Sequence, residues 1–316
     1  MTIQDFIRYM KRTVAEDLAQ SRGEEYQVDS REVIKTNDRV LHALVISRKG
    51  SRAGVNVYMD DLFRRHENGE DFSDLGREAV TMVTEALSFP IPPSAMIGSL
   101  GLEDIRKRLT LRLIDVTRNC SYMADLPYIE LESGLAMIAE INEDESICSE
   151  WRIVVTKGLL KMIGCEAEEL FTAALQNMIS IEPPVLMRLA DIALNASGPE
   201  LLSSSEHGRE SEEPLCLTNT SRYKGAAALF YPGVMEKAAD LIGGAYYVVP
   251  SSIHEVLLVP EESVPDASRL SAMLKCANRE VIVDECDILS DNVFRFDPAA
   301  GKLAVADVMC YDSVCQ

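Results

Sequence analysis

Apolar residues follow helical spacing in some segments of this chain and strand spacing in others. The irregular order of these segments limits the folds that the chain can adopt. Residues 3–20 carry apolar side chains at helical spacing, whereas residues 40–50 and 53–62 indicate two strands joined by a short turn. An acidic turn separates a second pair of strand patterns, in residues 128–141 and 151–155. Because the strands come as hairpins and not as regular strand–helix–strand units, the pattern predicts an α+β fold. We expect mixed, largely antiparallel sheets packed by amphipathic helices.

Local patterns in the second half of the chain predict further elements. Residues 185–196, VLMRLADIALNA, have the spacing of an amphipathic helix. Residues 224–231, KGAAALFY, form a short apolar run that indicates a strand. Residues 232–244 begin with Pro and end with Gly, which is typical of a helix, and residues 266–280 also have a helical pattern.

The charge of the chain limits the partners it can bind. The 316 residues include 51 acidic and 31 basic side chains, which give a formal net charge of −20. Binding to nucleic-acid phosphates requires Lys and Arg to displace counterions, and anionic membranes repel an acidic surface. We therefore expect no direct nucleic-acid binding and no membrane binding. An acidic nucleic-acid mimic stays open as an alternative, although the acids are spread along the chain and form no ordered stripe.

Composition also suggests how the chain is divided. Residues 198–214 are rich in Ser, Gly, Pro and Glu, which predicts a mobile acidic linker or loop. It would separate an N-terminal α+β half, residues 1–197, from a C-terminal α+β half, residues 215–307, and residues 308–316 would form a flexible tail. The N-terminus has no apolar leader region, and no apolar run approaches the ~18 residues that span a bilayer. We expect a cytoplasmic protein.

Motifs of known chemistry are missing from the sequence. It contains no G-x-x-x-x-G-K-[ST] loop, no G-x-G-x-x-G after a strand and no G-x-S-x-G elbow. The four histidines are not paired at helical spacing, and the eight cysteines form no C-x-x-C. Cys310 and Cys315 flank a short tail segment, for which a free, mobile tail is the preferred interpretation over a disulfide or a metal site. We expect no cofactor and no metal.

The candidate catalytic residues lie in residues 246–260, YYVVPSSIHEVLLVP. Ser251, Ser252, His254 and Glu255 place two hydroxyls, an imidazole and a carboxylate within five residues. In a hydrolase, His254 would act as the base for one of the serines, oriented by a distant carboxylate. The alternative is a hairpin, because Pro250 interrupts a strand, the serines bond turn backbone, and strand alternation puts His254 and Glu255 on opposite faces. The hairpin is the preferred interpretation.

A second group of candidates follows the CLTN segment. Asn219 stands at the end of a predicted strand, where its side chain either bonds nearby turn backbone or contacts a ligand. Tyr223 and Lys224 add a polar patch beside it. These three residues are the candidate binding residues.

Acidic pairs in the chain are candidate metal ligands for a nuclease. Such a site requires carboxylates that converge at strand ends. With 51 acids in the chain, neighbouring pairs arise by chance. A solvated surface is therefore the preferred interpretation of Asp60, Asp61, Glu130, Glu132 and Glu140.

An ordered set of segments resembles a known family. CLTN, KGAAALFYPGVMEKAADLIGG, YYVVPSSIHEVLLVP and LSDNVFRFD occur in the order found in an uncharacterised domain-of-unknown-function family, which is common in gut Clostridia and often found near mobile elements. The resemblance covers nearly the whole chain except residues 198–214 and the tail. The chain is more distantly similar to an uncharacterised Bacillus-type family. The resemblance implies a bacterial cytosolic α+β protein, and it transfers no catalytic residue.

Together these observations predict a non-enzymatic cytosolic interaction or regulatory protein with an unknown protein partner. An accessory of a mobile element is one form of this role. The first alternative is a hydrolase that uses residues 251–255, and the second is the acidic nucleic-acid mimic. The position of His254 relative to a hydroxyl and a carboxylate separates the first alternative from the main prediction. The substrate, the partner and the oligomeric state stay open.

Overall fold

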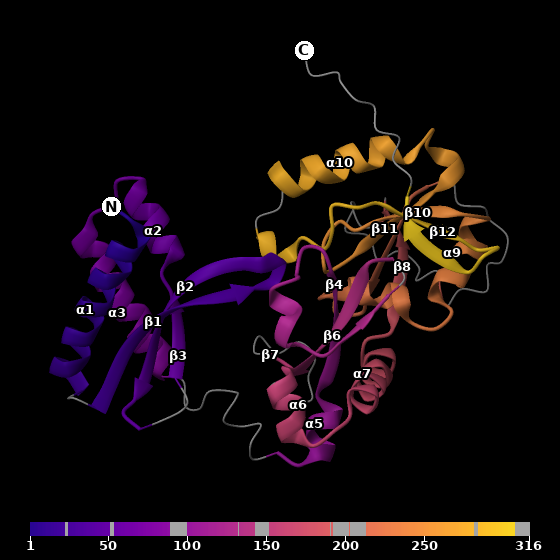
Figure 1. The fold of residues 1–316 in the computed structure, drawn as a ribbon. Helices are drawn as coiled ribbons and strands as arrows, with labels where there is room; N and C mark the ends of the chain where they lie inside the picture. The colour runs from indigo at the N-terminus through magenta and orange to yellow at the C-terminus, as the bar shows by residue number, and fades with distance from the viewer. Residues whose placement is uncertain are drawn as a thin grey trace. The chain divides into compact units, whose positions relative to one another are not determined.

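The chain folds into two compact units, Met1–Gly101 and Leu102–Gln316. Helices pack against three sheets whose strand pairs are antiparallel, so the predicted α+β class is confirmed (Figure 1). The computed structural model describes residues 1–22, 25–50, 54–88, 100–131, 133–142, 152–189, 191, 202, 213–280 and 284–306.

The first unit packs helices on a three-stranded sheet with the strand order β1-β2-β3. Its helices are α1 (Ile3–Arg22), α2 (Asp60–Glu67) and α3 (Phe72–Ser88), and its strands are β1 (Tyr26–Lys35), β2 (Arg39–Arg48) and β3 (Gly54–Tyr58). Helix α1 buries one apolar stripe, which includes Phe6 and Met10, against Leu44 and Ile46 of β2. The predicted β2–β3 hairpin is confirmed, whereas β1 was not predicted.

The second unit contains two sheets. In the four-stranded sheet the order is β4-β6-β5, with β7 also paired to β6, and the six-stranded sheet has the order β13-β12-β10-β11-β9-β8. The strands are β4 (Leu109–Asp115), β5 (Tyr128–Glu130), β6 (Leu135–Asn142), β7 (Arg152–Val154), β8 (Pro184–Arg188), β9 (Leu215–Asn219), β10 (Tyr246–Val249), β11 (Val256–Pro260), β12 (Phe294–Asp297) and β13 (Lys302–Val305).

Helices cover these sheets. Helix α7 packs against β4, and α10 lies beside β10, where Leu270 and Leu274 join the core under Tyr247 (Figure 1). The helices of this unit are α5 (Leu102–Lys107), α6 (Lys157–Ile163), α7 (Ala167–Ile181), α9 (Val234–Ile242) and α10 (Ala267–Glu280), and short 3-10 turns include η4 (Gly225–Phe230) and η6 (Glu285–Asp287).

Strands β4 and β6 are buried along their whole length. In their antiparallel register, Glu140 of β6 lies opposite Thr110 of β4. Arg112 lies two residues further along β4, so its side chain projects from the same face as that of Glu140. The pairing of these two strands therefore places opposite charges together inside the unit.

One predicted element is wrong, and another is right only in part. Residues 184–188 form β8 and pair with β9, because the strand partner overrides the helical spacing at the start of the predicted helix 185–196. Leu189 and Asp191 are helical, and residues 190 and 192–196 lie outside the described residues. Residues 225–230 form the 3-10 turn η4 and no strand. Gly225 to Leu229 are all buried, and a short buried apolar run does not distinguish a strand from a helical segment. The predicted hairpin around residues 250–255 is confirmed, since β10 and β11 pair from Tyr246–Pro260 to Val249–Leu257.

The two units do not coincide with the predicted halves. Strands β8 and β9, which precede and follow residues 198–214, pair with each other in one sheet, while the observed boundary falls between Gly101 and Leu102. The tail, with Cys310 and Cys315, lies outside the described residues. Among the helices that are described, none combines the length and the apolar character needed to cross a membrane.

Candidate functional site

Four charged side chains meet inside the second unit, and we call them the buried charge cluster. Glu140 is 2% exposed, and its carboxylate is shared by three cations. Lys224 Nζ lies 2.5 Å from Glu140 Oε2, and Arg112 Nε lies 3.1 Å from Oε1. Arg152 Nη1 lies 3.8 Å from Oε2. All three cations are less than a tenth exposed, so each of these charges is held by protein and not by water.

The charges of the cluster shift one another's protonation. Burial alone would raise the pKa of Glu140, but the positive charges of Arg112 and Lys224 lower it to about 2. Burial lowers the pKa of Lys224 to about 8, although Glu140 opposes this shift. The carboxylate is thus fully ionised at neutral pH. Removing one member of such a buried pair leaves its partner as an unpaired charge.

Lys224 belongs to a loop that Asn219 holds in one conformation. Asn219 is fully buried at the end of β9, and its side chain bonds both ends of Tyr223. Its Nδ2 donates to the Tyr223 carbonyl at 3.0 Å, while the Tyr223 N–H donates to its Oδ1 at 3.2 Å. Asn219 Nδ2 also donates to buried Glu182, which accepts a further bond from Ser221 Oγ at 2.8 Å. The side chain therefore acts within its own turn, which was one of the two predicted roles.

The backbone around Tyr223 is strained. Arg222 and Lys224 have φ values of 57° and 52°, a region that residues with a side chain rarely adopt. At Gly225, a Cβ atom would lie 2.6 Å from Asn219 N and 2.7 Å from His254 O, so only glycine fits. Such strain persists only where surrounding contacts determine the conformation, and it occurs often at functional positions.

The loop presents Tyr223 at the surface with its ring supported from inside. Tyr223 is 39% exposed. The Arg152 guanidinium lies 4.5 Å from the centre of its ring, and the His254 ring lies 5.2 Å away. The aromatic side chain is thus fixed by a buried cation and a neighbouring ring.

The two ring nitrogens of His254 contact two different segments. Its Nδ1 accepts a hydrogen bond from the Lys224 N–H at 3.0 Å, which in the neutral ring leaves the proton on Nε2. Nε2 lies 3.5 Å from Asp287 Oδ1 in η6. The imidazole therefore ties the Tyr223 loop to η6, and the predicted binding and catalytic candidates come together at one place.

The serines beside His254 have other partners. Ser252 Oγ accepts the backbone N–H of His254 at 3.0 Å, and Ser251 Oγ donates to Glu255 Oε1 at 3.2 Å. The Cys216 thiol faces the same Glu255 carboxylate at 3.7 Å. Among the hydrogen bonds of the described residues, none joins the His254 ring to a hydroxyl or a thiol. In this arrangement His254 is not placed as a base beside Ser251 or Ser252.

Sequence reasoning missed the interior of this site. The solvated surface expected for Glu140 is wrong, because β6 is buried on both faces. The signal was present, since Glu140 is the only charge within the apolar stretch LAMIAEIN. Arg112 and Arg152 were not singled out, and their convergence on Glu140 depends on strand register. Within the described residues, no group of three or more His, Cys, Asp or Glu side chains is arranged to hold a metal ion.

The fold and the site define an α+β protein in which a buried charge cluster supports one surface loop. The chain belongs to the Family of unknown function (DUF5688), whose model matches residues 3–298. This confirms the resemblance to an uncharacterised domain family. Searches of the curated proteins and of the solved structures found no protein that matches the chain.

Proposed function

We propose that this protein acts in the cytoplasm as a non-enzymatic interaction protein, and that its partner-binding surface centres on Tyr223. The observation that carries the proposal is the strained loop of residues 219–225, which holds a half-exposed tyrosine in one orientation. The exposed free thiols of Cys120 and Cys276 fit a reducing compartment.

Tyrosine is well suited to this role. Side chains that dominate binding energy at protein interfaces are enriched in Tyr, Trp and Arg, and they gain most when they are already ordered. The Tyr223 backbone is bonded at both ends by Asn219, and its ring lies on the Arg152 guanidinium. A partner would therefore meet an aromatic group whose ordering cost has largely been met by folding.

The buried charge cluster supports the same loop. Lys224 follows Tyr223 directly, and its ammonium is held by Glu140 inside the unit. Movement of Tyr223 away from the surface would pull Lys224 out of a buried ion pair, which is strongly unfavourable. We infer that the cluster keeps the loop in its binding conformation.

The alternatives have less support. The hydrolase requires His254 Nε2 or Nδ1 to reach a hydroxyl, and these atoms instead face Asp287 and the Lys224 N–H. The nucleic-acid mimic stays a prediction, and a surface potential map tests it. A continuous acidic ridge at the phosphate spacing of a duplex would favour the mimic.

Affinity capture from a native bacterial lysate tests the proposal. The bait is the full chain as wild type, as Tyr223→Ala and as Tyr128→Ala. Tyr128 is a matched control because it is 43% exposed, on strand β5. Circular dichroism first checks that each bait is folded, and mass spectrometry then identifies the captured proteins.

We expect wild type and Tyr128→Ala to recover the same protein in stoichiometric amount, and Tyr223→Ala to lose it. Truncation of a central interface tyrosine typically costs about 2 kcal/mol or more, which is roughly thirtyfold in affinity. Recovery of the same partner by Tyr223→Ala would refute the proposed surface. Failure of all three baits to retain any stoichiometric partner would refute the interaction function.

A further inference from the structure

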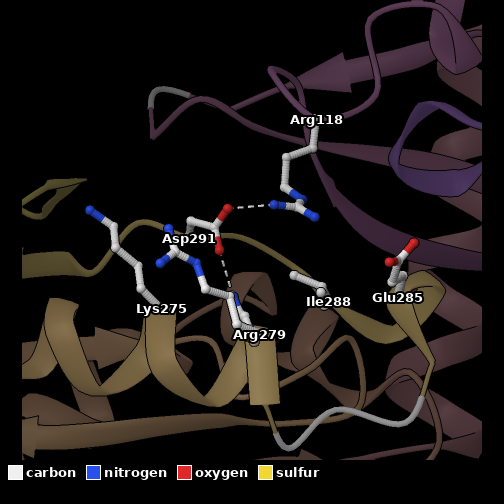
Figure 2. Close-up of a pocket in the computed structure, with 7 residues that line it drawn as sticks. Arg118, Lys275, Arg279, Glu285, Ile288 and Asp291 are labelled. Atoms are coloured by element: carbon white, nitrogen blue, oxygen red, sulfur yellow. Dashed lines mark hydrogen bonds and ion pairs between the residues drawn. The ribbon is translucent and has the colours of Figure 1, made fainter.

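A pocket of the second unit carries two cations, Lys275 and Arg279, that form no ion pair among the described residues, unlike the cations of the buried charge cluster. Its volume is about 520 Å³, which is within the range for small-molecule sites. Arg118 approaches from the turn after β4, whereas Lys275 and Arg279 project from α10 on the other side (Figure 2). Glu285 lies across the pocket from Lys275 (Figure 2).

The walls of this pocket are fixed to one another. Asn278 of α10 donates from Nδ2 to Asp291 Oδ1 at 2.8 Å and to the Ser290 carbonyl at 3.1 Å. Asp291 also pairs with Arg118 (Figure 2). Buried Asp115, at the end of β4, accepts bonds from both Ser290 Oγ and the Arg118 N–H. Three separate segments are thereby held together, so the helix wall that carries Lys275 and Arg279 and the turn that carries Arg118 are fixed relative to each other before any ligand binds.

The side chains of Lys275 and Arg279 do not take part in the bonds that join the pocket walls. Both are exposed, and neither has an ion pair within the part of the chain that the structure describes. They are four residues apart on α10, so their like charges face each other at a spacing that is mildly unfavourable for a helix. Arg118 adds donor capacity, since its Nε–H has no hydrogen-bond partner among the described residues.

We propose that this pocket binds the phosphate group of a small-molecule phosphate monoester. Lys275 and Arg279 supply two uncompensated charges on one wall, which match the dianion of a monoester. The Arg279 guanidinium can bond two phosphate oxygens at once, and the Lys275 ammonium contributes a point charge. Arg118 provides further N–H donors from the opposite wall, and its own charge is already balanced by Asp291.

The overall charge of the protein makes this pocket distinctive. A chain of net charge −20 repels anions at long range, so anion binding requires a local site. The volume is suited to a small molecule, and Glu285 on the far side can accept a hydrogen bond from a ligand hydroxyl. The ligand expected is therefore a phosphorylated, hydroxyl-bearing small molecule. This inference stands apart from the Tyr223 surface and does not depend on it.

Isothermal titration calorimetry of the full chain with three matched probes tests the ligand class. Methyl phosphate is a monoester and is mostly a dianion at pH 7.5, because its second pKa is about 6. Dimethyl phosphate has the same chemistry with a single charge, and acetate is a carboxylate with a single charge. We expect methyl phosphate to bind at least about tenfold more tightly than either of the others. Equal affinities for the three probes, or no binding of methyl phosphate, would overturn the proposal.

Variants locate the binding. The double variant K275Q/R279Q is expected to weaken methyl phosphate binding at least about tenfold. Its control is K161Q/K237Q, which removes two exposed lysines of the same unit outside the pocket and should bind as wild type does. Equal weakening by both variants would show non-specific attraction and overturn the site. A phosphoserine peptide that bound while methyl phosphate did not would overturn the small-molecule assignment.

Discussion

The second unit contains positive charges in two contrasting environments. In the buried charge cluster, three cations are less than a tenth exposed and converge on Glu140. In the pocket beside α10, Lys275 and Arg279 are exposed, adjacent and without an ion pair among the described residues. Charges that the chain itself neutralises hold its architecture, whereas charges left without a partner are available to a ligand. Substitutions at the two places should therefore have different effects on stability.

The largest expected effect is at Glu140. Glu140→Gln leaves Lys224, Arg112 and Arg152 buried without their carboxylate, and we expect it to lower the free energy of unfolding by about 3–5 kcal/mol. Urea unfolding measures this change. Glu130→Gln is the control, because Glu130 is exposed on the neighbouring strand β5, and its effect should stay within about 0.5 kcal/mol. Equal, small effects of both substitutions would show that the cluster does not stabilise the fold.

Acid should remove the same contribution. The folded-state pKa of Glu140 is about 2, below its ordinary value of 4.5, so its ionised form stabilises the protein above pH 4.5. This stability is lost as the pH falls from 4.5 towards about 2, and it amounts to about 3 kcal/mol. The unfolding free energies of wild type and Glu140→Gln should converge over this range. A difference that stayed constant from pH 6 to about pH 2.5 would contradict the ionisation assigned to Glu140.

A smaller effect is expected at Gly225, which lies beside the cluster. The added methyl of Gly225→Ala would collide with Asn219 N and His254 O, and overpacking of this kind costs about 1–3 kcal/mol. Gly244→Ala is the matched control, because a Cβ there meets no atom within 4 Å. Thermal unfolding compares the two variants. Equal melting temperatures would mean that the Tyr223 loop is not locked.

The smallest effect on stability is expected at the pocket. K275Q/R279Q removes a like-charged pair and no ion pair of the described residues, so stability should rise slightly or stay within about 0.5 kcal/mol of wild type. A gain in stability would accompany a loss of ligand binding, as is common when a functional residue is replaced. Urea unfolding measures the change, and a loss of more than about 1 kcal/mol would show that these cations have a structural role.

The sequence predicted several helices and turns because these elements are determined by residues close together along the chain. Helices α1 and α10 have apolar stripes with helical spacing, and Pro250 placed the turn between β10 and β11. By contrast, β8 has the spacing of a helix and becomes a strand because β9 pairs with it. Tertiary pairing of this kind leaves no local signal.

Only the part of the candidate site that lies within one short stretch of sequence was predicted. Asn219, Tyr223 and Lys224 are neighbours along the chain, so their patch was visible. Their contact with His254 and Glu140 joins segments 30 and 84 residues away from Lys224. The spacing of Lys275 and Arg279 can be read from the sequence, but the approach of Arg118 to this helix cannot, because Asp115 bonds both the Arg118 N–H and Ser290, 175 residues away.

The most direct test of the contrast is the urea unfolding of wild type and K275Q/R279Q, each with and without methyl phosphate. Circular dichroism follows the transition. Methyl phosphate at about ten times its dissociation constant should stabilise wild type by about 1.4 kcal/mol and leave the variant unchanged, while the variant alone should be at least as stable as wild type. Two results would contradict the assignment of Lys275 and Arg279 to ligand binding. One is a variant that is less stable than wild type without methyl phosphate, and the other is a variant that methyl phosphate stabilises as much as wild type.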